Sequence, residues 1–422
     1  MDKLKYRDLN TSYFHSKANQ QNRQNFISKL VLDDGTIVVN EQEIGKTMVD
    51  YFKTMFTLSN PTSFDSILDN IDTKVTTAMN AELTKCFTVE KVEQALKQMK
   101  LMTAPRPDRM PPIFYKAYWS TVGPDVIDAT LSVLNSGTMP PLLNHTFISL
   151  IPKIKSPKRA KDFHPISLCN VMYKLISKSI AKILKLISES QSAFMSNRLI
   201  TNNILVAFET LHHLKNRRQG KTGFMALKLD MSKAYDRVEW VFLEKIMKKL
   251  GFDDKWIALI STCIRLVSFS VMVNGEPCGL FHPNRGLHQG DPLSPYLFLL
   301  CAKGLHSLIK QAKNNGTIRG VSLCKNGPRV SHLFFADDNL LFCRANNHDC
   351  GAILEVLDKY EQASGQQINR DKTQICFSTN MERSIQESIK ALLGVAAITQ
   401  YEKYLGLSSF VGRATKTELQ LY

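Results

Sequence analysis

The sequence predicts an α+β fold in which a β-hairpin and a separate strand bring carboxylates to one edge of a sheet. The hairpin is expected over 331–343, where two short apolar arms flank the pair Asp337-Asp338. Asp-Asp-Asn between two such arms is typical of a tight turn, so both carboxylates are expected at the hairpin tip. The separate strand is expected over 224–229, and Asp230 follows it directly.

These aspartates favour a site for a divalent cation. Neighbouring carboxylates repel each other, and burial adds to the cost of keeping both ionised. A hard cation such as Mg²⁺ relieves both costs. An acidic hairpin turn by itself is more often only solvated, but a second strand that ends in aspartate favours the metal site. If the two strands are neighbours, three carboxylates would hold two Mg²⁺ ions about 3.5–4 Å apart, which suits in-line phosphoryl transfer.

The net charge indicates a polyanionic partner, most often nucleic acid. The 422 residues carry 54 Lys and Arg against 38 Asp and Glu, a formal charge of +16. Nine cations between 153 and 185 are opposed only by Asp162, next to a strand expected over 148–153. A run this one-sided suits a groove for a phosphate backbone, with a plain solvated face as the alternative. The cations are Lys153, Lys155, Lys158, Arg159, Lys161, Lys174, Lys178, Lys182 and Lys185.

Cysteine usage and the N-terminus indicate a reducing, intracellular compartment. The nine cysteines include no Cys-x-x-Cys pair, which argues against zinc ribbons, and their scatter argues against a disulfide framework. The N-terminal segment is too polar for a signal peptide, and no apolar run is long enough to span a membrane. At this length we expect two or three domains or one multi-lobed unit.

Turn and helix signals place the remaining elements. A hairpin is expected over 30–39, around Asp34-Gly35. Thr88 is expected to cap one helix, and Gly251 is expected to end another. Helices are expected over 41–57, 88–100, 113–118, 125–135 and 239–250.

A glycine-flanked segment, RGLHQGDPLSP at 285–295, lies between the two acidic elements. Glycines beside Gln289 allow the backbone to approach a planar ligand closely. Pro292 is expected in the first turn of a helix that contains the apolar run 296–301. The segment is a weak signal alone, and its place between the carboxylate elements strengthens it.

Four segments in this order resemble reverse transcriptases, and more specifically the polymerase of plant LINE-type non-LTR retrotransposons. The segments are LDMSKAYD (229–236), GLHQGDPLSP (286–295), FADD (335–338) and INRDK (368–372). Further agreement lies at 9–20, 165–178, 188–209 and 403–407. The resemblance therefore covers nearly the whole chain.

The resemblance implies a right-hand polymerase fold with fingers, a palm and a truncated thumb. The palm would be an antiparallel sheet with helices packed on one face. The upstream endonuclease domain and most of the thumb are expected to be missing. The implied divisions are a basic N-terminal extension over 1–100, fingers over 101–222, a palm over 223–378 with a fingers insertion at about 255–285, and a primer-grip region with a thumb stub over 379–422.

The resemblance also implies catalytic roles for single residues. Asp230 and Asp337 would be metal ligands and Asp338 the third carboxylate, with two Mg²⁺ ions or Mn²⁺ in their place. Tyr235 matches the steric gate that excludes a ribose 2′-OH. Lys372 matches a proton donor to pyrophosphate, which is a general-acid role.

Other residues match positions that contact the nucleotide and the primer. Gln289 and Gly290 match the loop that lies against the incoming nucleotide and the template. Ala336 would line the nucleotide pocket, and Lys153 matches a fingers lysine near the triphosphate. Tyr404-Leu405-Gly406 resembles the primer-gripping turn.

The chain departs from the family pattern at several positions. His164 stands where an arginine normally meets the triphosphate, and a neutral imidazole lacks the forked guanidinium. Arg106 and Arg109 replace glycines that permit unusual φ angles. Further departures lie at 196–198, His288, Asn339 and Ser408.

The implied activity is that of an RNA-directed DNA polymerase. A primer 3′-OH would attack the α-phosphate of a dNTP and release pyrophosphate. The implied partners are an RNA template, a DNA primer and dNTPs, with an endonuclease in trans and no membrane, and the family implies the nucleus. Two alternatives remain open. One is a nucleic-acid-binding remnant without catalysis, consistent with His164 and the missing thumb. The other is an RNA-dependent RNA polymerase, which Tyr235 argues against.

Overall fold

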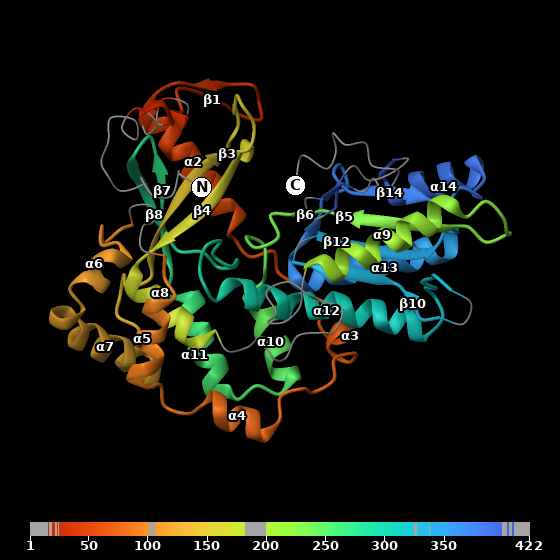
Figure 1. The fold of residues 1–422 in the computed structure, drawn as a ribbon. Coiled ribbons are helices and arrows are strands. Elements are labelled where there is room, and N and C mark those ends of the chain that lie inside the picture. The colour runs from red at the N-terminus through yellow and green to blue at the C-terminus, as the bar shows by residue number, and fades with distance from the viewer. Residues whose placement is uncertain are drawn as a thin grey trace.

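Two sheets form the framework of the chain, and most of the helices pack beside and between them (Figure 1). One sheet has the strand order β11-β12-β5-β14-β15, and the other has the order β4-β3-β7-β8. This computed structural model describes residues 26–100, 106–181, 200–324, 327–336 and 338–398, with positions 16, 19–21, 23, 25, 403–404 and 407–408 in addition.

Strand β5 (Phe224–Leu229) is the centre of the five-stranded sheet. It pairs antiparallel with β12 (Asp338–Arg344) and with β14 (Gln374–Phe377), and β12 pairs antiparallel with β11 (His332–Phe335). The edge strand β15 (Ala396–Ala397) runs parallel to β14. The expectation of a wholly antiparallel sheet is therefore wrong at this edge, because the helical crossover between β14 and β15 brings the chain back in the same direction.

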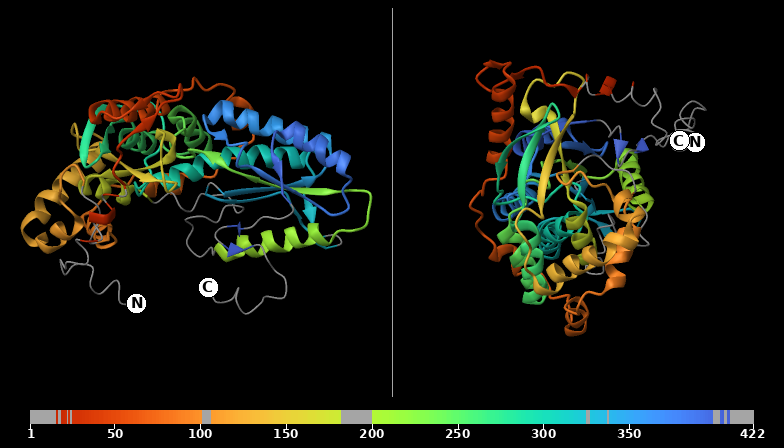
Figure 2. Two further views of the ribbon diagram at one scale, coloured as in Figure 1. Left: turned by 90° about the horizontal axis from the view of Figure 1, so that it is seen from above. Right: turned by 90° about the vertical axis from the view of Figure 1, so that its left-hand side faces the viewer.

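Helices cover both faces of this sheet, whereas the sequence predicted helices on one face. Met225, Leu227 and Leu229 belong to the main core, together with residues of several helices. Phe224 and Ala226 belong to a separate core on the other face, under α9 (Ile200–Asn216) (Figure 2). Because β5 is apolar on both sides, each face needs a cover that excludes water. The helices that contribute to the main core include α10 (Trp240–Leu250), α12 (Ser294–Asn314) and α13 (Asn347–Ser364).

The acidic hairpin has a shorter turn than the sequence predicted. Phe335 pairs with Asp338, so only Ala336 and Asp337 lie between the paired positions. Ala336 has a φ of +52°, in the left-handed region that two-residue hairpin turns use. Asp338 and Asn339 therefore belong to β12 and not to the turn.

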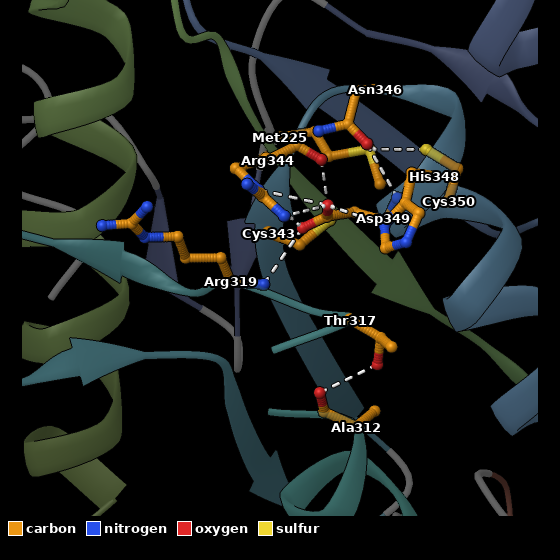
Figure 3. Close-up of polar contacts among 10 residues, drawn as sticks. All are labelled: Met225, Ala312, Thr317, Arg319, Cys343, Arg344, Asn346, His348, Asp349 and Cys350. Atoms are coloured by element: carbon orange, nitrogen blue, oxygen red, sulfur yellow. Dashed lines mark hydrogen bonds and ion pairs between the residues drawn. The ribbon is translucent and has the colours of Figure 1, made fainter. Parts of the chain in front are cut away.

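A buried aspartate anchors the opposite end of β12 (Figure 3). Arg344 donates to Asp349 through Nη2 at 2.8 Å and through Nε at 3.1 Å. The N–H of Arg319 donates to the same carboxylate at 3.0 Å. The Asp349 N–H donates to the capping side chain of Asn346 at 2.7 Å. Since Asp349 is fully buried, these donors satisfy its carboxylate and tie β12 to α13.

The four-stranded sheet joins segments that lie far apart in the chain. β3 (His145–Pro152) pairs antiparallel with β4 (Phe163–Cys169) and parallel with β7 (Ser268–Val273). β7 in turn pairs antiparallel with β8 (Glu276–Phe281). Helix α2 (Glu41–Met55) packs on this sheet and contributes to its core.

Most elements predicted outside the sheets are present. The N-terminal hairpin consists of β1 (Leu30–Val31) and β2 (Ile37–Val38). Gly251 ends α10 with a φ of +93°, as expected. Two predictions are wrong in detail: Thr88 is at the N-cap but makes no side-chain capping bond, and Pro295 rather than Pro292 lies in the first turn of α12. The confirmed helices are α2, α5 (Val89–Lys97), α6 (Pro112–Ala117), α7 (Trp119–Ser136) and α10.

Short elements complete the described chain. No helix in the described ranges is both long enough and apolar enough to cross a bilayer. The remaining helices are α3 (Asp65–Leu68), α4 (Thr77–Leu83), α8 (Val171–Ile180), α11 (Asp254–Arg265), α14 (Arg383–Leu393) and the 3₁₀ helix η1 (Ala160–Asp162). The remaining strands are β6 (Met231–Ser232), β9 (Val321–Ser322), β10 (Arg329–Val330), β13 (Gln367–Ile368), β16 (Lys403–Tyr404) and β17 (Leu407–Ser408).

Candidate functional site

A cleft of about 1370 Å³ collects most of the residues that the sequence singled out. Its walls come from α2, from the β3–β4 connection, from the segment after β5, from the loop 285–295 and from the turn 369–372. Residues distant in sequence, from β4 of the four-stranded sheet and from the segments that follow β5 and β11, thus share one concavity, which is the usual setting of a binding site. The predicted site residues in its lining are Lys153, His164, Asp230, Tyr235, Gln289, Gly290, Ala336 and Lys372.

Asp230 follows β5 and is held by backbone bonds on both sides. Its N–H donates to Thr373 Oγ1 at 3.2 Å, and its carbonyl accepts the N–H of Asn369 at 2.8 Å. The N–H of Lys372 also donates to the Asn369 carbonyl, at 3.2 Å. The turn between β13 and β14 therefore fixes the backbone of Asp230 and brings Lys372 to the same cleft.

Asp338 begins β12, the strand next to β5. Asn339 pairs with Leu229, so Asp338 and Asp230 stand at the same level of the sheet. Asp338 Oδ1 lies 3.9 Å from Lys228 Nζ, and the aspartate side chain is 43% exposed, which leaves it accessible to a ligand. Among the described side chains, no three or more His, Cys, Asp or Glu form a metal-binding group, and Asp337 lies outside that set.

Tyr235 is fixed by an aromatic stack at the side of the cleft. Its ring lies on that of Phe298 of α12, with centroids 4.6 Å apart and planes 16° apart. The N–H of Leu287 donates to its carbonyl at 2.8 Å. The segment after β5 and the loop 285–295 are therefore bonded to each other beside the predicted gate.

The loop at Gln289-Gly290 is bonded to β4. The N–H of Ser167 donates to the Gln289 carbonyl at 2.8 Å. Gly290 has a φ of +111°, and an added Cβ would lie 2.9 Å from the Ser167 carbonyl oxygen. The close approach that this glycine permits is therefore an approach to β4, which is a reason for glycine that the sequence did not reveal.

Two buried polar residues flank Gln289-Gly290. Asp291 accepts a hydrogen bond from Tyr173 Oη at 3.1 Å, and burial raises the pKa of Asp291. His288 is 3% exposed, lies edge-on to Phe269, and has no described partner for either ring nitrogen. Burial lowers the pKa of His288 to about 4. The imidazole is therefore neutral at pH 7 and belongs to the core, although it stands where the family commonly has arginine.

Sequence reasoning missed several charged residues of the cleft, among them Lys233 and Asp236. Asp236 is 5% exposed, and burial raises its pKa to about 6. Burial lowers the pKa of Lys233 to about 8. Both residues stand inside the recognised segment LDMSKAYD, but no sequence signal indicates which of its side chains enter the cleft.

The arginines that replace family glycines have contrasting environments. Arg109 has a φ of +55°, so the backbone keeps a left-handed conformation that costs a non-glycine residue about 1 kcal/mol. Arg106 is 3% exposed, and its Nε and Nη1 have no hydrogen-bond partner in the described structure. Both observations agree with the expectation that glycine suits this segment better.

Several predicted residues lie outside the described part of the chain. They include Asp337, and also Lys182 and Lys185 of the basic run. In the predicted primer grip, the backbone of Tyr404 pairs within the β16–β17 hairpin, and Leu405 and Gly406 are not described. The roles of these residues remain predictions.

Comparison with known proteins decides the family. A family model described as "Reverse transcriptase (RNA-dependent DNA polymerase)" matches residues 151–408. The chain belongs to this family. Its fold is therefore that of a right-hand polymerase, and most residues that line the cleft lie within the matched region, the others belonging to 30–33 and to α2.

Three relatives are similar to parts of this chain. The first is the "Transposon TX1 uncharacterized 149 kDa protein" of Xenopus laevis, 25% identical over 373 residues, which are 87% of this chain and 28% of the relative. The second is a retrovirus-related Pol polyprotein from the type-1 retrotransposable element R2 of Popillia japonica, 30% identical over 223 residues, 50% of this chain and 35% of the relative. The third is an uncharacterized mitochondrial protein of Arabidopsis thaliana, 52% identical over 67 residues, 16% of this chain and 55% of the relative. The chain thus spans only part of each of these relatives.

Proposed function

We propose that this chain is the polymerase region of a non-LTR retrotransposon protein and copies RNA into DNA. The supporting observation is that Asp230 directly follows β5 and Asp338 begins the neighbouring strand β12, within the region that matches the family. The reaction is the attack of a primer 3′-OH on the α-phosphate of a dNTP, with release of pyrophosphate. Positioning and charge neutralisation would supply most of the acceleration.

The donor set fits a divalent metal. Asp230 and Asp338 offer hard carboxylate oxygens from adjacent strands, and Asp337 would add a third. When bound, two ions of Mg²⁺, or of Mn²⁺ in its place, lower the pKa of the attacking hydroxyl and stabilise the leaving group. Reverse transcriptases as a family use divalent ions.

The other cleft residues would hold and select the nucleotide. The Tyr235 ring, fixed against Phe298, would exclude a ribose 2′-OH, while Gln289, Gly290 and Ala336 would form the wall beside the base and sugar. Lys153 would bind the triphosphate beside His164, and Lys372 would donate a proton to pyrophosphate.

The nucleic acid would lie along the basic segment after β3. An A-form RNA–DNA hybrid is recognised by its shape and its phosphates, which lysines at 153–161 would contact. Tyr404-Leu405-Gly406 would grip the primer, and an endonuclease would act in trans at chromosomal DNA in the nucleus. The 52% identity with the Arabidopsis thaliana protein supports a plant LINE lineage.

Primer extension tests the proposal directly. The full chain, an RNA template, a DNA primer, dNTPs and Mg²⁺ would be compared with Asp337→Asn and with Asp72→Asn. Asp72 is a matched control because its side chain is 71% exposed and its carboxylate approaches only Lys310, at 3.9 Å, among the ion pairs of the described residues. We expect extension by the parent and by Asp72→Asn, and none by Asp337→Asn.

If the parent chain does not extend the primer, the His164→Arg variant would be tested in the same assay. Extension after this change would mean that the palm works and that the triphosphate contact is damaged. If this variant also gives no extension but binds RNA in a salt-sensitive manner, the polymerase is rejected in favour of the nucleic-acid-binding remnant. Preference for rNTPs over dNTPs would instead favour an RNA-dependent RNA polymerase.

A further inference from the structure

Lys233 connects the two walls of the cleft. It follows Asp230 by three residues, and its backbone has a φ of +54°. Its Nζ lies 3.5 Å from the Phe163 carbonyl oxygen of β4 and 6.0 Å from the ring centroid of Tyr51 on α2. The side chain therefore extends from the segment that carries Asp230 to the four-stranded sheet.

The charges around Lys233 leave an excess of cations. Burial is the main reason why the pKa of Lys233 is lowered; among its charged neighbours Asp236 raises this pKa, and Lys153 and Arg237 lower it. Asp236 is nearly fully buried. Lys153, Lys233, Asp236 and Arg237 all line the cleft. A multiply charged anion between the two lysine amines would relieve their repulsion, and this is the arrangement in which lysine binds phosphate groups.

The backbone of Lys233 is costly to hold. A non-glycine residue at positive φ loses about 1 kcal/mol, and such residues concentrate at functional sites. The bond to the Phe163 carbonyl is at the long limit for a hydrogen bond and returns little of that cost. A stronger acceptor bound in the cleft would form a stronger hydrogen bond with the Lys233 amine.

We propose that Lys233 and Lys153 form a clamp for the β- and γ-phosphates of the incoming nucleotide, which leave as pyrophosphate. Lys153 would hold the phosphates from the β3–β4 connection and Lys233 from the segment after Asp230. Lys233 then supplies a charge-assisted contact in a cleft where His164 stands in place of the family's arginine. The inference deepens the proposed polymerase function and rests on it.

The first test is binding of inorganic tripolyphosphate to the full chain without Mg²⁺. Binding is measured as the rise in the melting temperature with increasing ligand concentration. We expect Lys233→Gln to weaken binding about tenfold or more and Lys233→Arg to restore most of it. The control is Lys245→Gln. Lys245 is also partly buried and lies 5.0 Å over the Phe64 ring, but it is not among the residues that line the cleft. If Lys233→Gln and Lys245→Gln bind tripolyphosphate as the parent does, the clamp is rejected.

The second test separates this inference from the proposed function. In primer extension we expect Lys233→Gln to raise KM for dNTP and to weaken inhibition by pyrophosphate by a similar factor. If the parent extends the primer and the Lys233→Gln variant keeps the parent's KM and pyrophosphate inhibition constant, the clamp is rejected and the polymerase proposal stands. If the parent does not extend the primer but binds tripolyphosphate through Lys233, the polymerase proposal is rejected and the phosphate site stands. A residue that only tethers the two walls would change the melting temperature and leave pyrophosphate inhibition unchanged.

Discussion

Arg285 and Glu239 form a buried ion pair beneath the loop that carries Gln289 and Gly290. Arg285 Nη1 lies 3.2 Å from Glu239 Oε1, and the two side chains are 9% and 0% exposed. Arg285 Nε also donates to the Met55 carbonyl at 3.0 Å, at the end of α2. The pair therefore joins α2, the start of α10 and the predicted nucleotide loop.

We expect Glu239→Gln to lower the free energy of unfolding by about 3–5 kcal/mol, because it leaves the Arg285 charge buried without its opposite charge. Urea denaturation measures the change. The control is Glu244→Gln: Glu244 pairs with Arg265 at 2.8 Å, with side chains 25% and 45% exposed, and its pair should contribute about 1 kcal/mol or less. Equal losses in the two variants would contradict a special role for the buried pair.

Replacing Tyr235 by alanine should reduce discrimination against rNTPs by about tenfold or more, because the ring stacked on Phe298 would no longer fill the space beside the sugar. The measurement is the ratio of kcat/KM for a dNTP to that for its rNTP. Tyr235→Phe keeps the ring and should keep the ratio. A similar loss in the phenylalanine variant would assign the effect to the hydroxyl and not to steric exclusion.

Stability should fall as the pH falls from 6.5 towards 4, in part because of His288. Its folded-state pKa is about 4, below the ordinary value of 6.5, so in this window the unfolded chain binds a proton that the folded chain does not. The contribution is present above pH 6.5 and is lost on acidification, by up to about 3 kcal/mol at pH 4.

His288→Leu should therefore flatten the fall in stability with acid, and it should raise stability at pH 7 by about 1–2 kcal/mol because two unpartnered nitrogens leave the core. Urea midpoints at pH 4.5 and pH 7 give both quantities. His212→Leu changes an exposed histidine and should alter neither. If His288→Leu shifts the urea midpoint equally at pH 4.5 and pH 7, the assigned pKa of His288 is wrong.

Asp349→Asn should destabilise the chain by about 3 kcal/mol, since Arg344 and the Arg319 N–H both depend on this fully buried carboxylate (Figure 3). Asp358→Asn is the control. Asp358 lies 3.9 Å from Arg370, with both side chains more than half exposed, and its loss should cost less than about 1 kcal/mol. Unfolding midpoints in urea compare the two variants. A similarly small effect of both would mean that the Arg344 pair does not anchor β12.

Local pattern was sufficient for much of this protein. The apolar run of β5, the short apolar arms of β11 and β12, and Gly251 after α10 each reflect preferences that act within a few residues, so they can be read without the fold. The order of the recognised segments pointed to the family that residues 151–408 match.

Long-range contacts needed the tertiary structure. No local rule pairs 145–149 with 268–272 in parallel, makes Gly290 necessary by placing it against Ser167, or requires α9 on the second face of the five-stranded sheet. The same holds for Lys233, whose reach to Phe163 depends on two sheets meeting across one cleft. Residue type determines which backbone conformations and charges are available, whereas packing of distant segments determines which of those charges meet and which are withdrawn from water.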